Sequence, residues 1–141
     1  MTFLLDTDSF TLAYFDRHGV RERIATARRA DTVGLAVVTV WEVLRGRIDA
    51  VLKAEDAERL RAARVNLRRS EAYLAEFPAF DFDDPAPDLF EQFSSDRRIR
   101  KAGRNDLLIA CICLAHGATL VSRNTKDFQG IPNLKLENWA D

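Results

Sequence analysis

Short apolar runs recur along the chain, separated by longer segments in which apolar and charged residues mix. Apolar runs of this length, bounded by polar residues or glycine, are typical of buried strands. The β-branched run that begins at Val33 is the clearest example. The pattern predicts strands at residues 3–5, 33–38, 79–82, 119–121 and 134–136.

The segments between these runs predict helices. Ser9 can cap the first one, which carries several aromatic residues and ends before Gly19. The last one, from Asp106, is apolar on every side over residues 107–115, as is typical of a buried helix. The other helices are expected at about 21–30, from Thr39 to an end or bend at Gly46, at about 52–77, and from about Asp88 after an acidic loop at 83–88.

Alternation of strands and helices from end to end predicts an α/β fold. We expect a mainly parallel sheet of four to five strands flanked by helices, in a single domain spanning residues 1–141. In such sheets the ligand site lies beyond the carboxyl ends of the strands, near the point where the strand order reverses. The polar residues that follow each strand are therefore the first candidates for a site.

Composition narrows the class of protein. The net charge of −1 excludes a globally basic nucleic-acid binder but allows a local basic patch. The two cysteines, Cys111 and Cys113, lie in the apolar helix and are expected to be buried thiols, not zinc ligands. Asp6 and Asp8 interrupt the first apolar run before a secretory signal could form, and no run approaches the roughly 20 residues of a membrane span. We expect a cytoplasmic protein without membrane contact.

Acidic residues follow the first two strands. Asp6 comes directly after the first strand, where it can serve as a ligand or simply cap the next turn. Glu42 follows the second strand within Thr39-Val40-Trp41-Glu42, a pattern that also predicts a capping box at a helix start. A carboxylate that caps a helix in this way is not free to hold a metal.

Further polar groups follow later in the chain. Asp106 opens the buried helix, where it can act in a site or favour the helix dipole. Asn124 and Asp127 follow the fourth strand, although Asp127 can equally be a turn residue paired with Lys126. A parallel sheet would gather all these groups at one edge. Two carboxylates 4 Å apart repel by about 4 kcal/mol at an effective dielectric near 20, so the cluster needs protons or cations. A hard cation such as Mg²⁺ fits oxygen ligands and can promote phosphodiester hydrolysis.

The order and spacing of these motifs resemble PIN-domain toxins of the VapC type over essentially the whole chain. The resemblance is carried by Leu4-Leu5-Asp6-Thr7-Asp8, Thr39-Val40-Trp41-Glu42, Gly103-Arg104-Asn105-Asp106, the segment 119–128, and the ending Ile131-Pro132-Asn133-Leu134-Lys135-Leu136-Glu137-Asn138-Trp139.

The resemblance implies a Mg²⁺- or Mn²⁺-dependent endoribonuclease that cleaves tRNA or ribosomal RNA, stops translation, is neutralised by a VapB-type antitoxin and forms a homodimer. By position, Asp6, Glu42 and Asp106 match the family's acidic metal site. Asn124 stands where many relatives have a fourth acid, so Asn124 or Asp127 is expected to complete the site, and a second metal position is left open.

Basic residues cluster just before Asp106. The basic run consists of Arg97, Arg98, Arg100, Lys101 and Arg104. We expect Arg98, Arg100 and Arg104, together with Arg123, to contact RNA phosphates, although a solvated helix face would have the same composition. Paired aromatic residues that would stack on bases are not evident in the sequence.

Two alternatives differ in chemistry. Asp6-Thr7-Asp8-Ser9 after an apolar strand superficially fits the first motif of aspartyl-nucleophile phosphatases of the haloacid dehalogenase class, but the later motifs fit poorly. A catalytically degenerate PIN module that binds RNA or a protein partner is the other alternative, and Asn124 is the feature that keeps it open.

Overall fold

A parallel five-stranded sheet forms the centre of the molecule, with strand order β3-β2-β1-β4-β5. The computed structural model describes residues 1–141 apart from the side chain of Arg100. The strands are β1 Thr2–Leu5, β2 Thr32–Ala36, β3 Ala79–Phe80, β4 Thr119–Val121 and β5 Lys135–Glu137. The predicted α/β class and parallel sheet are confirmed.

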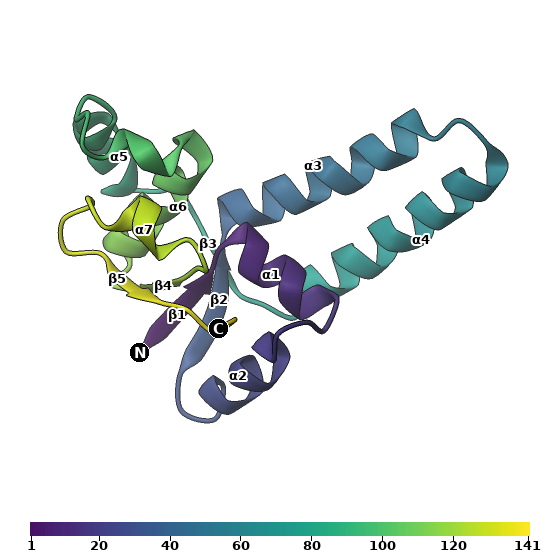
Figure 1. The fold of residues 1–141 in the computed structure, drawn as a ribbon, viewed down its shortest axis with the longest axis horizontal. Coiled ribbons are helices and arrows are strands. Elements are labelled where there is room, and N and C mark those ends of the chain that lie inside the picture. The colour runs from purple at the N-terminus through teal and green to yellow at the C-terminus, as the bar shows by residue number, and fades with distance from the viewer.

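Helices cover both faces of the sheet (Figure 1). Their bounds are α1 Thr7–Tyr14, α2 Val20–Ala27, α3 Val37–Lys53, α4 Ala57–Leu74, α5 Ala86–Ser94, the 3₁₀ turn η1 Arg100–Ala102, α6 Arg104–Ala115 and α7 Thr125–Phe128. Successive side chains of a strand point to opposite faces. Leu4 therefore joins a core with α5, α6 and α7, whereas Phe3 and Leu5 join a second core with α1, α2 and the inner ends of α3 and α4.

The second strand is shorter than predicted because α3 begins early. β2 ends at Ala36, and the β-branched residues Val37 and Val38 already belong to α3, which continues through Gly46 to Lys53. The predicted helix start at Thr39 is therefore wrong, and of the two alternatives expected at Gly46 the helix end is excluded. Tertiary packing of an amphipathic face outweighs the low helix propensity of these residues.

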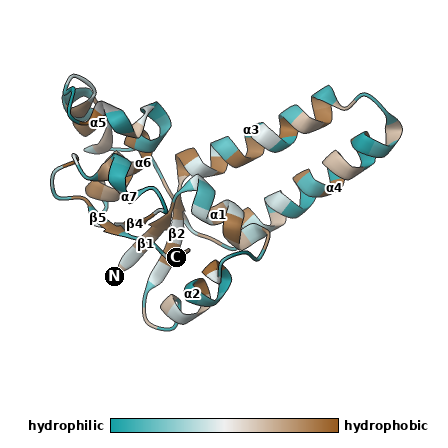
Figure 2. Ribbon diagram, in the orientation of Figure 1, coloured by the Kyte–Doolittle hydropathy of each residue, from teal (hydrophilic) through white to brown (hydrophobic). Residues whose placement is uncertain are grey.

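The predicted single helix over 52–77 is also wrong, because the chain reverses direction within it. α3 ends at Lys53, and α4 starts after Asp56, whose side chain accepts a hydrogen bond of 2.7 Å from the backbone N–H of Arg59. The two helices form a hairpin that projects from the sheet (Figure 1). Apolar and polar residues alternate along both arms, whereas β1, β2 and α6 are mostly hydrophobic (Figure 2).

The buried apolar helix predicted from Asp106 is confirmed as α6. Ile109 to Cys113 are fully buried, and both cysteines are free thiols. Burial raises the pKa of Cys111 to about 11, so this thiol stays protonated and unreactive near neutral pH. No helix in the described part of the chain is long and apolar enough to cross a membrane.

The strand order reverses direction next to β1, which pairs with β2 on one side and β4 on the other. The connections from β1 to β2 and β3 run one way across the sheet, and β4 and β5 are added on the opposite side. The crevice beyond the carboxyl ends of β1 and β4 is therefore the expected place for a ligand.

Candidate active site

Asp6 lies at the carboxyl end of β1, in the middle of this edge. Its backbone N–H donates to the carbonyl of Val121 at the end of β4, over 2.9 Å. One carboxylate oxygen accepts from the backbone N–H of Ser9 at 2.8 Å, so Asp6, and not Ser9, caps α1. Burial raises the pKa of Asp6, and hydrogen bonds from Ser122 and Ser9 oppose that rise. The fold thus holds a carboxylate in an environment that disfavours its charge.

Glu42 reaches the same edge from α3. Because α3 begins at Val37, Glu42 lies inside the helix and the predicted capping box is not formed. Its two oxygens accept hydrogen bonds from the Thr7 hydroxyl at 2.6 Å and the Asn105 amide at 3.1 Å. Glu42 therefore does not cap α3, and its carboxylate is held between the starts of α1 and α6.

Asp106 lies in the first turn of α6 and is half-buried. Burial, followed by the negative charges of Asp6, Glu42, Asp8 and Asp127 in that order, raises its pKa to about 6. These carboxylates come from the starts of α1, α6 and α7 and from the interior of α3, and their charges act on Asp106. The structure therefore brings together the acids that the sequence singled out, with Asp8 added.

Asn124 and Asp127 follow β4. The Asn124 side-chain amide donates to a carboxylate oxygen of Asp127, and the Asn124 backbone N–H donates to the Ser122 hydroxyl at 3.0 Å. Asp127 is half-buried and its charge acts on Asp106. Of the two, Asp127 contributes charge to the cluster, and Asn124 orients it.

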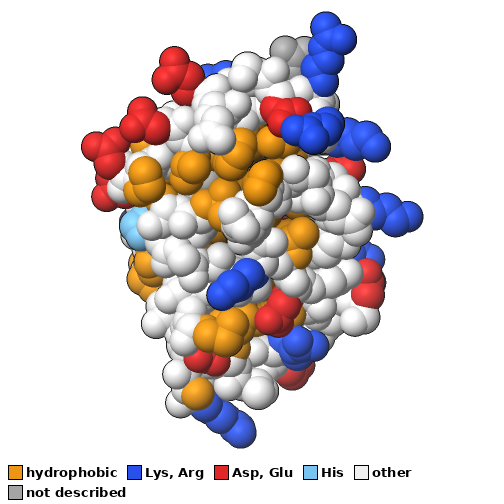
Figure 3. Space-filling model, turned by 90° about the vertical axis from the view of Figure 1, so that its left-hand side faces the viewer, with side chains coloured by type: hydrophobic (Ala, Val, Ile, Leu, Met, Phe, Trp, Pro, Cys, Tyr) orange, Lys and Arg blue, Asp and Glu red, His pale blue; other side chains and the backbone are white. Residues whose placement is uncertain are grey.

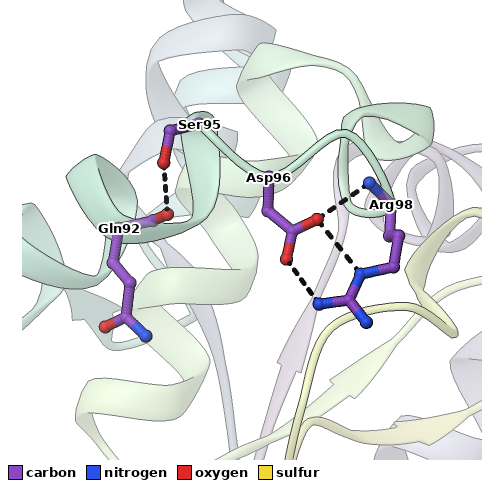
Figure 4. Close-up of polar contacts among 4 residues, drawn as sticks. All are labelled: Gln92, Ser95, Asp96 and Arg98. Carbon is purple, nitrogen blue, oxygen red and sulfur yellow. Dashed lines mark hydrogen bonds and ion pairs between the residues drawn. The ribbon is translucent and has the colours of Figure 1, made fainter.

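The four predicted RNA-contacting arginines differ in their surroundings. Arg98 is turned back onto Asp96, with its guanidinium nitrogens 3.1 and 3.3 Å from the two carboxylate oxygens (Figure 4). Arg123 lies 3.4 Å from Asp141 at the end of the chain. Arg104 borders the acidic site at the start of α6. The side chain of Arg100 lies outside the described part of the structure.

A shallow hollow opens at this edge beside Glu42 and Asp106. The start of α6 forms much of its wall, with residues 102–106. Among the side chains that the structure describes, no three His, Cys, Asp or Glu groups converge closely enough to hold one metal ion. The expected set of Asp6, Glu42 and Asp106 is thus a charge cluster in this arrangement, with Glu42 engaged by its two hydrogen-bond donors.

Sequence reasoning missed Thr7, Asn105 and Ser122 as parts of the site. Thr7 and Asn105 fix Glu42, and the fully buried Ser122 donates to Asp6. Each of the three lies directly beside a residue that the sequence singled out, namely Asp6, Asp106 or Arg123. This adjacency was the only available signal, because their partners are distant in sequence.

Comparison with known proteins identifies the class. The PIN domain family model matches residues 3–134, and the chain belongs to this family. The matched range contains all the acidic residues of the edge described above. The family match removes the support for the phosphatase alternative, whose motifs already fitted poorly.

The curated relatives are similar over nearly their whole length. "Ribonuclease VapC2" of Rickettsia felis is 27% identical over 143 residues, covering 99% of this chain and 98% of the relative. "tRNA(fMet)-specific endonuclease VapC" of Salmonella typhimurium is 26% identical over 146 residues, covering 99% of each. The crystal structure of VapBC2 from Rickettsia felis bound to a DNA fragment from their promoter contains a similar chain, with a TM-score of 0.80, 26% identity and 99% of both chains covered.

Proposed function

We propose that this protein is a divalent-metal-dependent endoribonuclease that acts as the toxin of a toxin–antitoxin pair. The single observation that carries the proposal is the acidic edge of a PIN-family fold, where Asp106 lies close enough to Asp6 and Glu42 for their charges to raise its pKa. Carboxylates gathered in this way repel one another when no cation is present, and a bound cation would relieve the repulsion. Relatives named as ribonucleases supply the substrate class.

The donor set fits a hard cation. Asp6 is 5% exposed and Asp106 is half-buried, and both present carboxylate oxygens to the same edge of the sheet. Mg²⁺ typically keeps several waters and uses one or two carboxylates together with substrate phosphates. We therefore assign Asp6 and Asp106 as protein ligands and leave the choice between Mg²⁺ and Mn²⁺ to experiment. When bound, the cation activates water and stabilises charge on the phosphate.

The remaining residues act through position and charge. Glu42, held by Thr7 and Asn105, is suited to orient a water molecule or a ligand water at the site. Asp127 adds negative charge, and Asn124 fixes its orientation. Arg104 is placed to attract the RNA backbone beside these acids. Arg98 and Arg123 must first leave Asp96 and Asp141 to do the same.

A VapB-type antitoxin is the proposed protein partner. Support comes from the similar chain of the Rickettsia felis VapBC2 structure, which resembles this protein over 99% of its length. Phe15, just after α1, and Trp41 on α3 are 48% and 56% exposed, and exposed apolar side chains often mark a protein-binding surface. The homodimer stays a prediction.

The test is cleavage of structured RNA by the purified chain. Activity should require Mn²⁺ or Mg²⁺, disappear with a chelator, and disappear in Asp6→Asn. Asp49→Asn is the matched control, because Asp49 is an exposed acid on the projecting arm of α3. RNA binding without cleavage under every metal condition would contradict the proposal and favour a degenerate binding module.

A further inference from the structure

A second hollow adjoins the acidic site on the side of α5. It contains about 250 Å³ and is bounded by Phe90 and Ser94 of α5 and by Gly103, Arg104 and Leu107 at the start of α6. Gly103 and Arg104 also border the hollow beside Asp106, so the two hollows are neighbours along this edge. A ligand at the acidic site would therefore extend past Arg104.

The walls of this hollow suit a planar, apolar group. The guanidinium of Arg104 lies over the Phe90 ring, 4.9 Å from its centroid, and Leu107 contributes an aliphatic side. Arg104 is exposed, so the outer surface of its planar guanidinium is open to a further ring. Nucleobases stack on aromatic rings and on arginine planes. The volume lies below the roughly 300–1,000 Å³ of pockets for drug-sized ligands, and suits one ring system better than a whole nucleotide.

Gly103 lies between the two hollows and places no side chain there. Its φ of +74° is in the region that favours glycine, and a Cβ built there would meet no described atom within 4 Å. The backbone alone forms the boundary at this point. An RNA strand whose phosphate lies at the proposed metal site beside Asp106 can therefore pass over Gly103 without meeting a side chain there.

We propose that the Phe90–Arg104 hollow binds the nucleobase adjacent to the scissile phosphate of the RNA. The proposal rests on the ribonuclease function above and specifies how that site selects its substrate. Arg104 has two parts in it, because its charge attracts the phosphate and its plane stacks on the base.

The face at the left of Figure 1 carries a band of apolar side chains at the height of α5 (Figure 3). Lys and Arg side chains lie on one side of this band, and Asp and Glu side chains lie on the other. Only the basic side of the band suits the phosphates of an RNA strand, whose bases can stack on apolar surface.

The test uses short single-stranded RNAs that carry 2-aminopurine at each position in turn, because stacking quenches its fluorescence. Binding is measured with the full chain and a chelator, so that cleavage does not interfere. One position should be strongly quenched in the wild type. Arg104→Lys, which keeps the charge and loses the plane, and Phe90→Leu, which keeps apolar volume and loses the ring, should both abolish that quenching.

Cleavage of the same RNAs with Mn²⁺ provides the second readout. Both variants should raise KM on the order of tenfold, with a much smaller change in kcat, and flatten the preference for the base at the quenched position. Arg28→Lys is the matched control, because Arg28 lies over Phe77 at 4.5 Å in the other core. It should leave quenching and base preference unchanged.

The outcomes separate the two proposals. Unaltered quenching and base preference in both Arg104→Lys and Phe90→Leu would overturn the base-binding hollow while cleavage by the wild type still supports the ribonuclease. Absence of cleavage by the wild type would overturn the ribonuclease, and the quenching experiment would still decide whether a base enters the hollow. Should Phe90→Leu fold poorly, Arg104→Lys alone decides, since its side chain is exposed.

Discussion

The hydroxyl of Thr7 donates to Glu42 across 2.6 Å, which ties the first residue of α1 to the interior of α3. The two residues follow different strands, and this bond holds the Glu42 carboxylate toward Asp106. Asn105 completes the arrangement from α6. The position of Glu42 thus depends on the starts of both α1 and α6.

Removal of this bond should impair catalysis more than folding. Thr7→Val keeps the shape of the side chain and removes the donor, so Glu42 loses orientation. We expect kcat to fall about tenfold, as is usual when a partner of a site carboxylate is lost. Steady-state kinetics and urea unfolding measure the two effects. Thr7→Ser restores the donor and should regain most of the activity; an equally low kcat in Thr7→Ser would contradict the role of the bond.

Asp106→Asn should stabilise the apo protein at neutral pH. The pKa of Asp106 rises from 3.8 to about 6 on folding, so the folded state binds the proton more tightly than the unfolded state. Below about pH 4 Asp106 is protonated in both states and does not affect stability. Between about pH 4 and 6 it ionises more readily in the unfolded state, so it increasingly destabilises the folded state. Above about pH 6 this loss of stability is complete. After solvent screening we expect a gain of about 1–2 kcal/mol at pH 7.5. Thermal unfolding at pH 7.5 and pH 4 tests this, and an equal gain at both pH values would contradict it.

Metal affinity should decrease in acid because protons compete for Asp106. Below its pKa of about 6, each further pH unit should weaken Mn²⁺ binding by up to tenfold. Calorimetric titration of the apo protein between pH 5 and pH 8 measures the change. Saturating Mn²⁺ should also raise the unfolding temperature at pH 7.5, and this increase should be absent in Asp6→Asn. A pH-independent affinity would show that Asp106 does not bind the metal.

Two glycines should respond oppositely to substitution by alanine. A Cβ on Gly34 of β2 would lie 2.7 Å from the Pro78 carbonyl and 2.8 Å from the Phe80 ring, so Gly34→Ala should destabilise the protein by about 1–3 kcal/mol. Gly46 lies inside α3, and a Cβ there would meet no described atom within 4 Å. Gly46→Ala should stabilise by about 0.5–1 kcal/mol. Denaturant unfolding compares the pair. Unchanged or increased stability of Gly34→Ala would contradict the packing at β2, and a loss of stability in Gly46→Ala would contradict the open space at α3.

The sheet was largely predictable because its strands are short apolar runs with polar ends. Runs 3–5 and 119–121 mark β1 and β4 closely, and the last strand lies one residue later than expected. The start of α3 was not predictable, since Val37 and Val38 favour strands when taken alone. The turn at Asp56 was hidden because the segment lacks glycine and proline, although aspartate is a preferred N-cap residue.

The acidic residues were predictable as a group because strand ends meet at one edge of a parallel sheet. Their partners were not, since the Thr7–Glu42 and Asn105–Glu42 bonds join residues 35 and 63 positions apart. The Arg104–Phe90 contact also escaped notice, because it depends on how α5 packs against α6. The charged residues of the site could be predicted from the sequence, whereas the residues that contact them depend on how the helices pack.

β1 pairs with the early strand β2 and the late strand β4, so the site needs segments from both parts of the chain. Asp6 is fixed by the backbone of Val121, and the Ser9 hydroxyl donates to the same carbonyl across 112 positions of sequence. A growing chain on the ribosome therefore has Asp6 and Glu42 long before it has the strand that fixes them. The acidic edge can therefore form only after β4 has been synthesised, because β4 supplies the backbone that holds Asp6.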